Sequence, residues 1–448
     1  MGQAVLLPHK PQIETARPAT ISLAQQTRNH IRNTGSRYTA ALAYPDFRTL
    51  WIGSLSAGAA SWALIVARGW LVYDLSDSSL WVGLVTFAAM IPRVLITPFT
   101  GYLADRFDRR KVMAIMFALN LGHNLVLAVV VLMGWATVWH LIVLSFVNGS
   151  ARAAQMPASQ ALIPNLVPRK LLLNAIALNQ ATMNGSRLLG PLAILPLLAT
   201  TGVGTAFLLC SIFYAISLTQ ALRVKTSSTG EIDPNRSFVS NMLEGVRYVY
   251  RTPTLRAIVL MALFHCGLTM SFESLLPVLS AQRLDAEGAG FSVLMMGVGA
   301  GAMVAVVGIA GVRSESLKGK LFLNLGVLSG LTPAVLALSS GMPMAVSASV
   351  AMGASQAGFM TLTHTMIQAI TLDKVRGRVG AVYSVHIGGM MASANLMNGF
   401  LADSLDAAML LLVAGVGFVI VMFASWQGVT LRGIYRQGLQ ATTAGAAD

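Results

Sequence analysis

The chain is a long, strongly apolar polypeptide with an excess of positive charge. Its 448 residues are 55% hydrophobic and only 11% charged, with a mean hydropathy of +0.67, which excludes an ordinary soluble protein and indicates a membrane protein. The net charge of +14 does not indicate nucleic-acid binding, because such a protein gathers its basic residues on a soluble face. Both cysteines, Cys210 and Cys266, lie inside apolar runs, so redox chemistry gains no support.

The first half of the chain predicts a tail followed by six membrane-spanning helices. Residues 1–48 are polar and basic and lack the apolar core of a signal peptide, so we expect a cytoplasmic N-terminal tail. A helix needs roughly 20 apolar residues to cross the bilayer core, and the runs that follow are of that order. They fall at 49–73, 80–103, 111–133, 137–158, 171–195 and 199–222, and form a first predicted bundle over 49–222.

A polar segment separates these runs from a second set of six. Residues 223–253 are predicted to form a cytoplasmic linker with an amphipathic helix near 239–250, and residues 429–448 a cytoplasmic C-terminal tail. The predicted fold is an all-α membrane protein with twelve transmembrane helices in two pseudo-symmetric six-helix bundles. The second bundle, over 254–428, contains the runs 254–280, 289–312, 319–340, 343–369, 378–402 and 405–427.

The distribution of Lys and Arg predicts the orientation in the membrane. Four of the 31 lie well inside the predicted spans, and one, Arg283, lies in a loop on the side opposite to the termini. All the others fall on the side of both termini, and cytoplasmic loops are the ones that accumulate such residues. We therefore expect both termini in the cytoplasm and a substrate site near the midplane, between the bundles.

The loop between the second and third predicted helices carries the most specific motif. Residues 101–111 read GYLADRFDRRK, which resembles the signature loop of the major facilitator superfamily, G-x-L-a-D-r-x-G-r-r. Asp108 replaces the second glycine, and this loop resembles that of the bacterial exporter branch that includes the enterobactin exporter, as do residues 70–73 and 91–93. The resemblance covers residues 49–428 and implies the major facilitator fold and solute export.

The same resemblance implies a gate on the cytoplasmic side. Asp105 is expected near the N-terminus of the eleventh helix, around Gly380, where the helix dipole favours an anion, and Arg109 and Arg110 would complete this latch. The alternative is that these charges only enforce the topology of the chain. The predicted gate residues are Gly101, Asp105, Arg106, Arg109 and Arg110.

A second segment, in the fifth predicted helix, also resembles a family motif. Residues 185–191 are similar to the glycine-proline motif of superfamily antiporters, which favours proton antiport. Small residues at these positions let helices approach closely. The paired glycines expected after the motif are Ile194 and Leu195 instead, so a plain proline kink explains the pattern as well.

Polar stripes on the fourth and fifth predicted helices predict an aqueous cavity. An ionised side chain at mid-bilayer costs roughly 2.5–3.5 kcal/mol on the insertion scale, so it must face protein or water. Arg152 resembles the fourth-helix arginine of the family, which the resemblance links to proton coupling and substrate charge. At helical spacing the stripes comprise Asn148, Arg152 and Gln155 on one helix and Gln180, Asn184 and Arg187 on the other.

Two further arginines lie inside the first predicted bundle. Arg93 follows Pro92 near the middle of the second helix and is assigned either to the substrate site or to a gate. Arg68 lies about one and a half turns from the outer end of the first helix, and we expect it to snorkel toward the outer surface.

The second bundle holds one carboxylate well inside a predicted span, Glu273. Burial disfavours the charged form of a carboxyl group, so Glu273, with Arg152, is predicted to take part in proton coupling. The alternative is a permanent structural pair between Glu273 and one arginine. His265, His364 and His386 are further candidate cavity residues, although a lone helical histidine is also common as a packing residue.

The charges inside the spans predict the class of solute. Four arginines accompany one glutamate, so the cavity is expected to attract an anionic, siderophore-like or amphipathic solute more than a lipophilic cation. The alternatives are multidrug efflux of neutral or cationic compounds and a transport-inactive membrane receptor.

Other classes of membrane protein find less support. A membrane enzyme would need convergent catalytic groups, and the short loops offer no such cluster and no metal-ligand spacing. An ATP-driven pump is disfavoured because no Walker-type motif occurs. The sequence therefore predicts a monomeric transporter of the bacterial inner membrane that handles a small molecule and protons, without a cofactor, a metal or a nucleic-acid partner.

Overall fold

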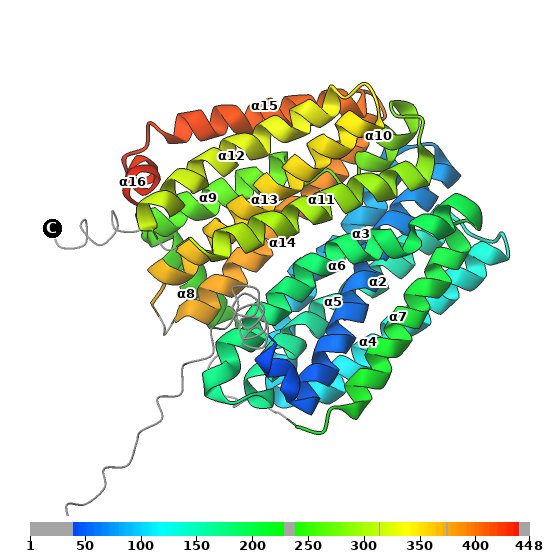
Figure 1. Cartoon of the computed structure of the whole chain (residues 1–448), viewed down its shortest axis with the longest axis horizontal. Helices are drawn as coiled ribbons and strands as arrows, with labels where there is room; N and C mark the ends of the chain where they lie inside the picture. The colour runs from blue at the N-terminus through cyan, green and yellow to red at the C-terminus, as the bar shows by residue number, and fades with distance from the viewer. Residues whose placement is uncertain (1–38, 228–237, 313, 373–374, 439–448) are drawn as a thin grey trace, which may run out of the picture.

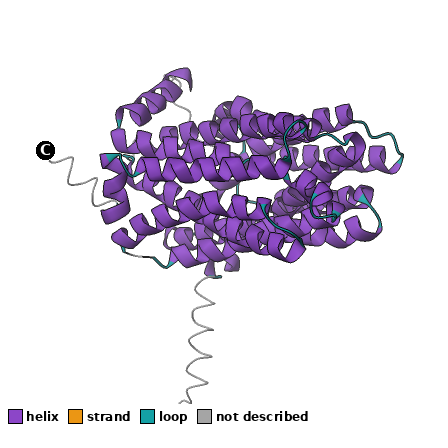
Figure 2. Cartoon of the chain, turned by 90° about the horizontal axis from the view of Figure 1, so that it is seen from above, coloured by secondary structure: helices purple, strands orange, loops and turns teal. Residues whose placement is uncertain are grey.

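In its described part the computed structural model consists of helices joined by loops (Figure 1, Figure 2). It describes residues 39–227, 238–312, 314–372 and 375–438, without the side chains of 97–106, 173 and 238–241. No strand occurs among these residues. The predicted fold class, an all-α protein with twelve crossings in two bundles, is confirmed.

The first bundle follows the predicted spans, with small shifts at the helix ends. Its first helix begins at Pro45, inside the predicted tail, because a proline suits the first turn of a helix. Asp108 caps the helix that follows the 101–111 motif, since its carboxylate accepts a hydrogen bond from the backbone N–H of Arg110 at 3.0 Å. The elements are η1 (Ala40–Ala43), α2 (Pro45–Ser76), α3 (Ser79–Arg106), α4 (Arg109–Leu132), α5 (Val138–Leu166), η2 (Arg169–Leu171), α6 (Leu172–Thr200) and α7 (Val203–Arg223).

The second bundle contains the remaining six crossings and two surface helices. The amphipathic helix predicted near 239–250 is α8 (Phe238–Arg251), which packs on α14 through an ion pair between Glu244 and Arg378 at 2.5 Å. A second amphipathic helix, α16 (Val429–Gln437), lies in the segment predicted as a tail. The crossings are α9 (Pro253–Leu268) with α10 (Leu276–Gln282), α11 (Glu287–Ala310), α12 (Glu315–Ala337), α13 (Met342–Ile370), α14 (Arg376–Ala402) and α15 (Ala407–Ser425).

The first crossing of the second bundle is broken, so the prediction of one continuous helix over 254–280 was wrong. A break at membrane depth is tolerated where protein groups satisfy the freed backbone N–H and C=O groups. Polar side chains of α13 and α14 do so between α9 and α10. Gln356 donates to the carbonyl of Thr269 at 2.7 Å, Asn398 donates to the carbonyl of Ser271 at 2.6 Å, and Asn395 accepts from the N–H of Ser274 at 3.1 Å.

The helices differ in how apolar they are. Seven described helices are long and apolar enough to cross a membrane by length and composition alone, namely α2, α3, α4, α7, α11, α12 and α15. The other long helices, α5, α6, α13 and α14, carry buried polar side chains such as Gln155, Arg187, Gln356 and Asn395. Because these side chains are buried, the polar groups face protein.

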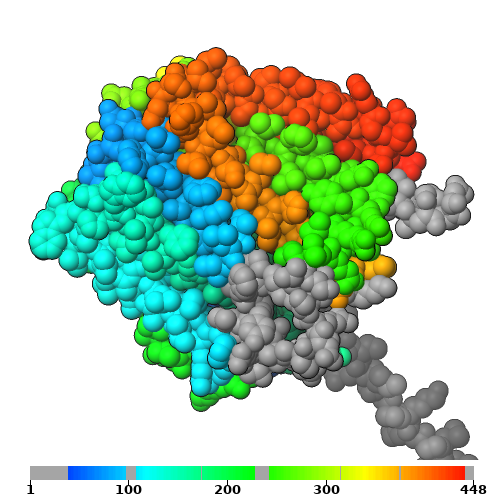
Figure 3. All heavy atoms as spheres, turned by 180° about the vertical axis from the view of Figure 1, so that it is seen from behind, coloured from blue at the N-terminus to red at the C-terminus, as the bar shows by residue number. Residues whose placement is uncertain are grey.

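Two helix pairs make the main contacts between the bundles. The helix α3 lies beside α14, as Figure 3 shows in blue and orange, and α6 lies beside α11. We name the end with α8, α16 and the start of α4 the linker end, and the end with the starts of α3 and α5 the distal end (Figure 1). The distal half of α3 packs closely on α14, since a Cβ atom at Gly83 would lie 3.0 Å from the Cα of Gly399.

The close contact between α11 and α13 depends on glycines, which have no side chain. A Cβ atom at Gly301 would collide with the carbonyl oxygen of Val350, whereas one at Gly308 of the same helix would meet no heavy atom within 4 Å. We expect Gly301→Ala to lower the thermal unfolding midpoint in detergent, because overpacking costs about 1–3 kcal/mol. Gly308→Ala should leave the midpoint unchanged. Equal midpoints for the two variants would contradict this packing.

Candidate solute-binding site

A cavity of about 290 Å³ opens on the first bundle. It is lined by residues of α2, α3, α5 and α6, in the halves of α2, α5 and α6 nearest the linker end and beside the middle of α3. The predicted cavity residues that line it are Arg93, Arg152, Gln155, Gln180, Asn184 and Arg187. The two predicted stripes therefore meet at one site, although they come from helices whose mutual packing the sequence does not reveal.

The α2 wall of the cavity was missed by the sequence reasoning. It consists of Ser54, Ala57, Gly58, Ser61 and Trp62, which recur at helical spacing along one face. The available signal was residues 53–61, which are nearly all small, in an otherwise bulky apolar helix. Further polar residues of the lining that were missed are Ser159, Gln160 and Asn179.

Two of the cavity arginines are held in place by neighbours. The guanidinium carbon of Arg187 lies 4.7 Å from the centroid of the Trp62 ring, a cation–π contact between α6 and α2. Arg93 reaches toward the second bundle, since a Cβ atom at Gly388 of α14 would lie 2.9 Å from its Cδ. Arg93 therefore belongs to the cavity lining and to the junction of the bundles at once.

Glu273 lies in the break between α9 and α10 and is 6% exposed. It interacts electrostatically with four arginines of the first bundle, Arg187, Arg152, Arg68 and Arg93. Among the described residues, no arginine nitrogen lies within the 4.0 Å of its carboxylate that defines an ion pair. This geometry fits a shared counter-charge better than a permanent pair with one arginine.

Arg68 does not snorkel, so that expectation was wrong. Its side chain is 5% exposed and interacts electrostatically with Arg152, Glu273 and Tyr214. The helix α2 continues to Ser76, two turns beyond Arg68, and its neighbours cover the side chain. Arg68 therefore adds to the positive charge beside the cavity.

Asn148 lies in the core of the first bundle and outside the described cavity lining. Its amide donates to the side-chain oxygen of Asn120 at 2.7 Å, and both residues are buried. Asn120, His123 and Asn124 form a buried polar face of α4 that the sequence reasoning missed. The spacing of three and four residues was the available signal on that helix.

The three candidate histidines also lie outside the described cavity lining. His265 is buried in the second bundle, where it lies 2.7 Å from the hydroxyl of Ser329 and packs against the rings of Phe359 and Phe418, as a packing residue would. His364 lies 3.3 Å from the amide of Gln368. His386 lies 3.0 Å from the hydroxyl of Tyr250, so it joins α14 to the linker helix α8.

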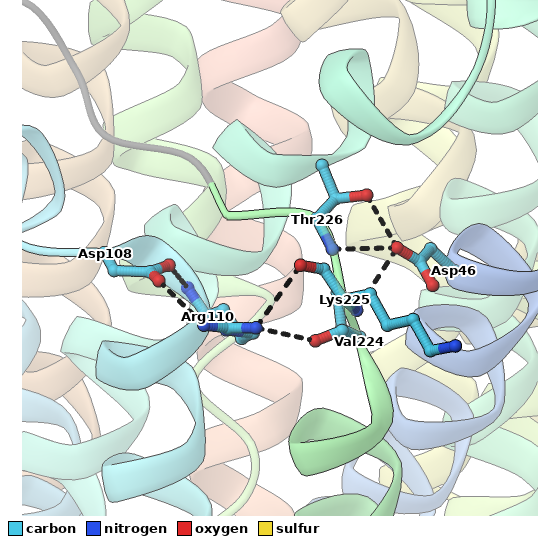
Figure 4. A network of polar contacts seen from close by, with 6 residues as sticks. All are labelled: Asp46, Asp108, Arg110, Val224, Lys225 and Thr226. Carbon is cyan, nitrogen blue, oxygen red and sulfur yellow. Dashed lines mark hydrogen bonds and ion pairs between the residues drawn. The ribbon is translucent and has the colours of Figure 1, made fainter.

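The described gate residues contact their own bundle. Arg109 donates to the carbonyl of Ala161 in α5 at 3.1 Å. Arg110 pairs with Asp108 at 3.2 Å and donates to the carbonyls of Val224 and Lys225 after α7 (Figure 4). The side chains of Asp105 and Arg106 and the surroundings of Gly101 lie outside the described residues.

A carboxylate from α2 completes this network at the linker end. Asp46 accepts hydrogen bonds from the hydroxyl and the N–H of Thr226 at 2.6 and 2.9 Å (Figure 4). The chain that leaves α7 is therefore tied to α2 by Asp46 and to α4 by Arg110. These contacts hold the linker end of the first bundle together as one unit.

Comparison with known proteins agrees with this architecture. A family model described as "Transmembrane secretion effector" matches residues 36–439. The chain is 26% identical to the multidrug efflux pump Tap of Mycolicibacterium fortuitum, over 81% of this chain and 93% of Tap. It is 22% identical to macrolide efflux protein A of Streptococcus pyogenes, over 82% and 92% of the two chains.

Two more matches extend the comparison. The staphyloferrin A transporter of Staphylococcus aureus is 23% identical, over 55% of this chain and 62% of that transporter. The crystal structure of the nucleoside transporter NupG superposes with a TM-score of 0.66 and 12% identity, over 85% of this chain and 98% of that chain. The chain belongs to the transmembrane secretion effector family of the major facilitator superfamily, and is a multi-pass membrane transporter and not an enzyme.

Proposed function

We propose that this protein exports a small anionic, siderophore-like or amphipathic solute across a bacterial inner membrane by alternating access, driven by proton antiport. The protein acts as a monomer with both termini and the linker end in the cytoplasm. The observation that carries the proposal is the cavity of the first bundle, which three arginines line.

The charge of the cavity supports an anionic solute. Arg93, Arg152 and Arg187 line it, and no acidic side chain stands among its described lining residues. Arg68 adds a fourth positive charge nearby, and Glu273 compensates only part of the total. Guanidinium groups bind carboxylates through two parallel hydrogen bonds, and water-excluded surroundings strengthen such contacts. The amide and hydroxyl groups of the lining would bind the remaining polar groups of a solute.

The position of the cavity supports loading from the cytoplasm. It occupies the halves of α2, α5 and α6 nearest the linker end, while α3 and α14 are packed together near the distal end. The two bundles run at an angle to each other, closer beside α10 than beside α8 (Figure 1). A rocking motion that separated the distal contacts would expose the same arginines to the opposite side.

Efflux of neutral or cationic drugs is the second candidate, because two of the relatives are named as multidrug and macrolide efflux proteins. Trp62 and Met156 give the cavity an apolar portion that such compounds could use. The positive charges of the arginines repel a cation, so anion export would use the arginines of the cavity and drug efflux its apolar portion.

A binding panel followed by flux measurements tests the proposal. Acidic and cationic metabolites are compared for thermal stabilisation of the purified protein, since a ligand of the folded state raises its apparent stability. Compounds that stabilise are then followed in proteoliposomes with an imposed pH gradient. We expect acidic compounds to stabilise and to move. Transport of cationic dyes alone would support drug efflux, and binding without flux would indicate a receptor.

A further inference from the structure

A carboxylate of the second bundle caps a helix of the first at the distal end. Asp403 follows the last residue of α14, and its Oδ1 accepts a hydrogen bond from the N–H of Ser79 at 2.6 Å. Its Oδ2 accepts one from the hydroxyl of Ser78, also at 2.6 Å. The N–H of Leu80 lies 3.4 Å from both oxygens. Ser79 and Leu80 begin α3 and Ser78 directly precedes it, so all three donors belong to the first bundle.

The start of α3 is suited to such a contact. The first N–H groups of a helix have no partner within the helix, and its dipole places partial positive charge there. Side chains normally supply the cap from the residue that precedes the helix. Here the carboxylate comes from a residue more than 300 positions away in the sequence, so the cap also joins two bundles.

The cap stands at the end of a continuous contact between α3 and α14. Moving toward the middle of the helices, Gly83 packs against Gly399, and Arg93 lies against Gly388. This antiparallel pairing brings the C-terminus of α14 to the N-terminus of α3. Separation of the bundles at the distal end must therefore break every hydrogen bond of Asp403 to α3.

We propose that Asp403 and residues 78–80 form a distal latch, which favours the conformation whose cavity opens toward the linker end. The latch rests on the alternating-access part of the proposed function. It acts on the balance of two conformations and not on the solute, so Asp403 is a positioning residue. Loss of the latch shifts the balance toward the conformation that is open at the distal end.

Asp406 provides a matched control at the same end of the molecule. Its carboxylate caps α15 by accepting from the N–H of Ala408 at 3.1 Å, and it lies 3.9 Å from Arg283. Both of these contacts stay within the second bundle. Removing Asp406 therefore removes the same charge and a similar helix cap without touching the described contacts between the bundles.

Distances between spin labels measure the balance directly and need no substrate. In a background with Cys210→Ala and Cys266→Ala, labels at Trp135→Cys and Ser340→Cys report the separation of the bundles at the distal end. Labels at Lys111→Cys and Lys320→Cys, introduced as a second pair, report the linker end. The distributions are recorded in lipid nanodiscs for the parent, Asp403→Ala, Asp403→Glu and Asp406→Ala.

We expect Asp403→Ala to change the ratio of distally closed to distally open molecules about fivefold toward open, the effect that loss of a helix N-cap has on an equilibrium. The linker-end pair should shorten in the same molecules. Asp403→Glu keeps a carboxylate and should restore most of the closed population, and Asp406→Ala should match the parent. Ser78→Ala, which removes one donor, should give an intermediate shift.

The latch is overturned if Asp403→Ala, like the control Asp406→Ala, gives the same distances as the parent at both ends. Unfolding of Asp403→Ala is checked by its elution as a monodisperse species, and Ser78→Ala serves in its place should that variant aggregate. A protein that carried no solute at all could still show the shift. Failure of the latch and failure of the proposed export are therefore separate results.

Discussion

Arg152→Ala should raise the solute concentration needed for half-maximal transport by roughly 10- to 150-fold, because a hydrogen bond to a charged group is worth about 1.5–3 kcal/mol. Arg152 lines the cavity and interacts electrostatically with Arg68, Arg93 and Glu273, so it lies at the centre of the charged cluster. Initial rates of solute uptake into inverted proteoliposomes, measured against solute concentration, give the value. Arg152→Lys keeps the charge but loses the planar guanidinium group, so its half-maximal concentration should lie between those of the parent and Arg152→Ala.

Although Arg152→Ala should weaken transport, it should not lower the stability of the folded protein. Arg152 repels Arg68 and Arg93, and Glu273 compensates only one charge, so removal of Arg152 relieves repulsion in the folded protein. We expect a thermal unfolding midpoint equal to or above that of the parent. Arg169→Ala, which removes an exposed arginine at the linker end, is the control for both measurements. Intact transport of an acidic solute by Arg152→Ala would exclude the arginine cavity as its site.

Much of the fold could be predicted because a bilayer imposes simple demands. A crossing must be long, apolar and internally hydrogen-bonded, so the hydrophobic runs predicted most helix ends of the first bundle within a few residues. The exception is α5, which ends at Leu166 where the prediction ended at 158. The amphipathic helix α8 was predictable from a different pattern, because its apolar and polar residues alternate at helical spacing. The polar stripes predicted five lining residues, because polar groups inside spans must face water or protein, and Arg93 was predicted separately.

The remaining features depend on partners far away in the sequence. The break before α10 requires Gln356 and Asn395 to satisfy its backbone, and nothing within residues 254–280 reveals them. Arg68 was misplaced because its distance from the helix end was known but the covering helices were not. Asp403 is a single carboxylate after an apolar run, and its role depends on the antiparallel pairing of α3 with α14.

Glu273→Gln should abolish solute accumulation driven by a pH gradient while leaving solute exchange across the membrane. Glutamine has nearly the same size as glutamate but cannot gain or lose a proton, so the coupling step is removed and the cavity is kept. Glu273 is suited to that step because it is buried and shares four arginines without a close ion pair. Accumulation under a pH gradient is compared with counterflow of labelled solute in the same proteoliposomes.

A carboxylate away from the cavity serves as the control. Glu287 is exposed at the start of α11, so Glu287→Gln changes the same chemical group at the distal surface and should transport like the parent. Gradient-driven accumulation that survives in Glu273→Gln would contradict a coupling role for this carboxylate. Loss of counterflow as well would instead indicate that Glu273 is needed to shape the binding site.

The direction of proton exchange separates the two halves of the proposed function. An anionic solute and the ionised Glu273 compensate the same arginines, so anion binding favours proton uptake by Glu273. Antiport requires the opposite, namely release of a proton when the solute binds. A solute group that interacts favourably with the ionised carboxylate of Glu273 would produce that release. Calorimetric titration in two buffers with different heats of ionisation counts these protons. Release supports antiport, uptake supports an anion carried together with a proton, and Glu273→Gln should show neither.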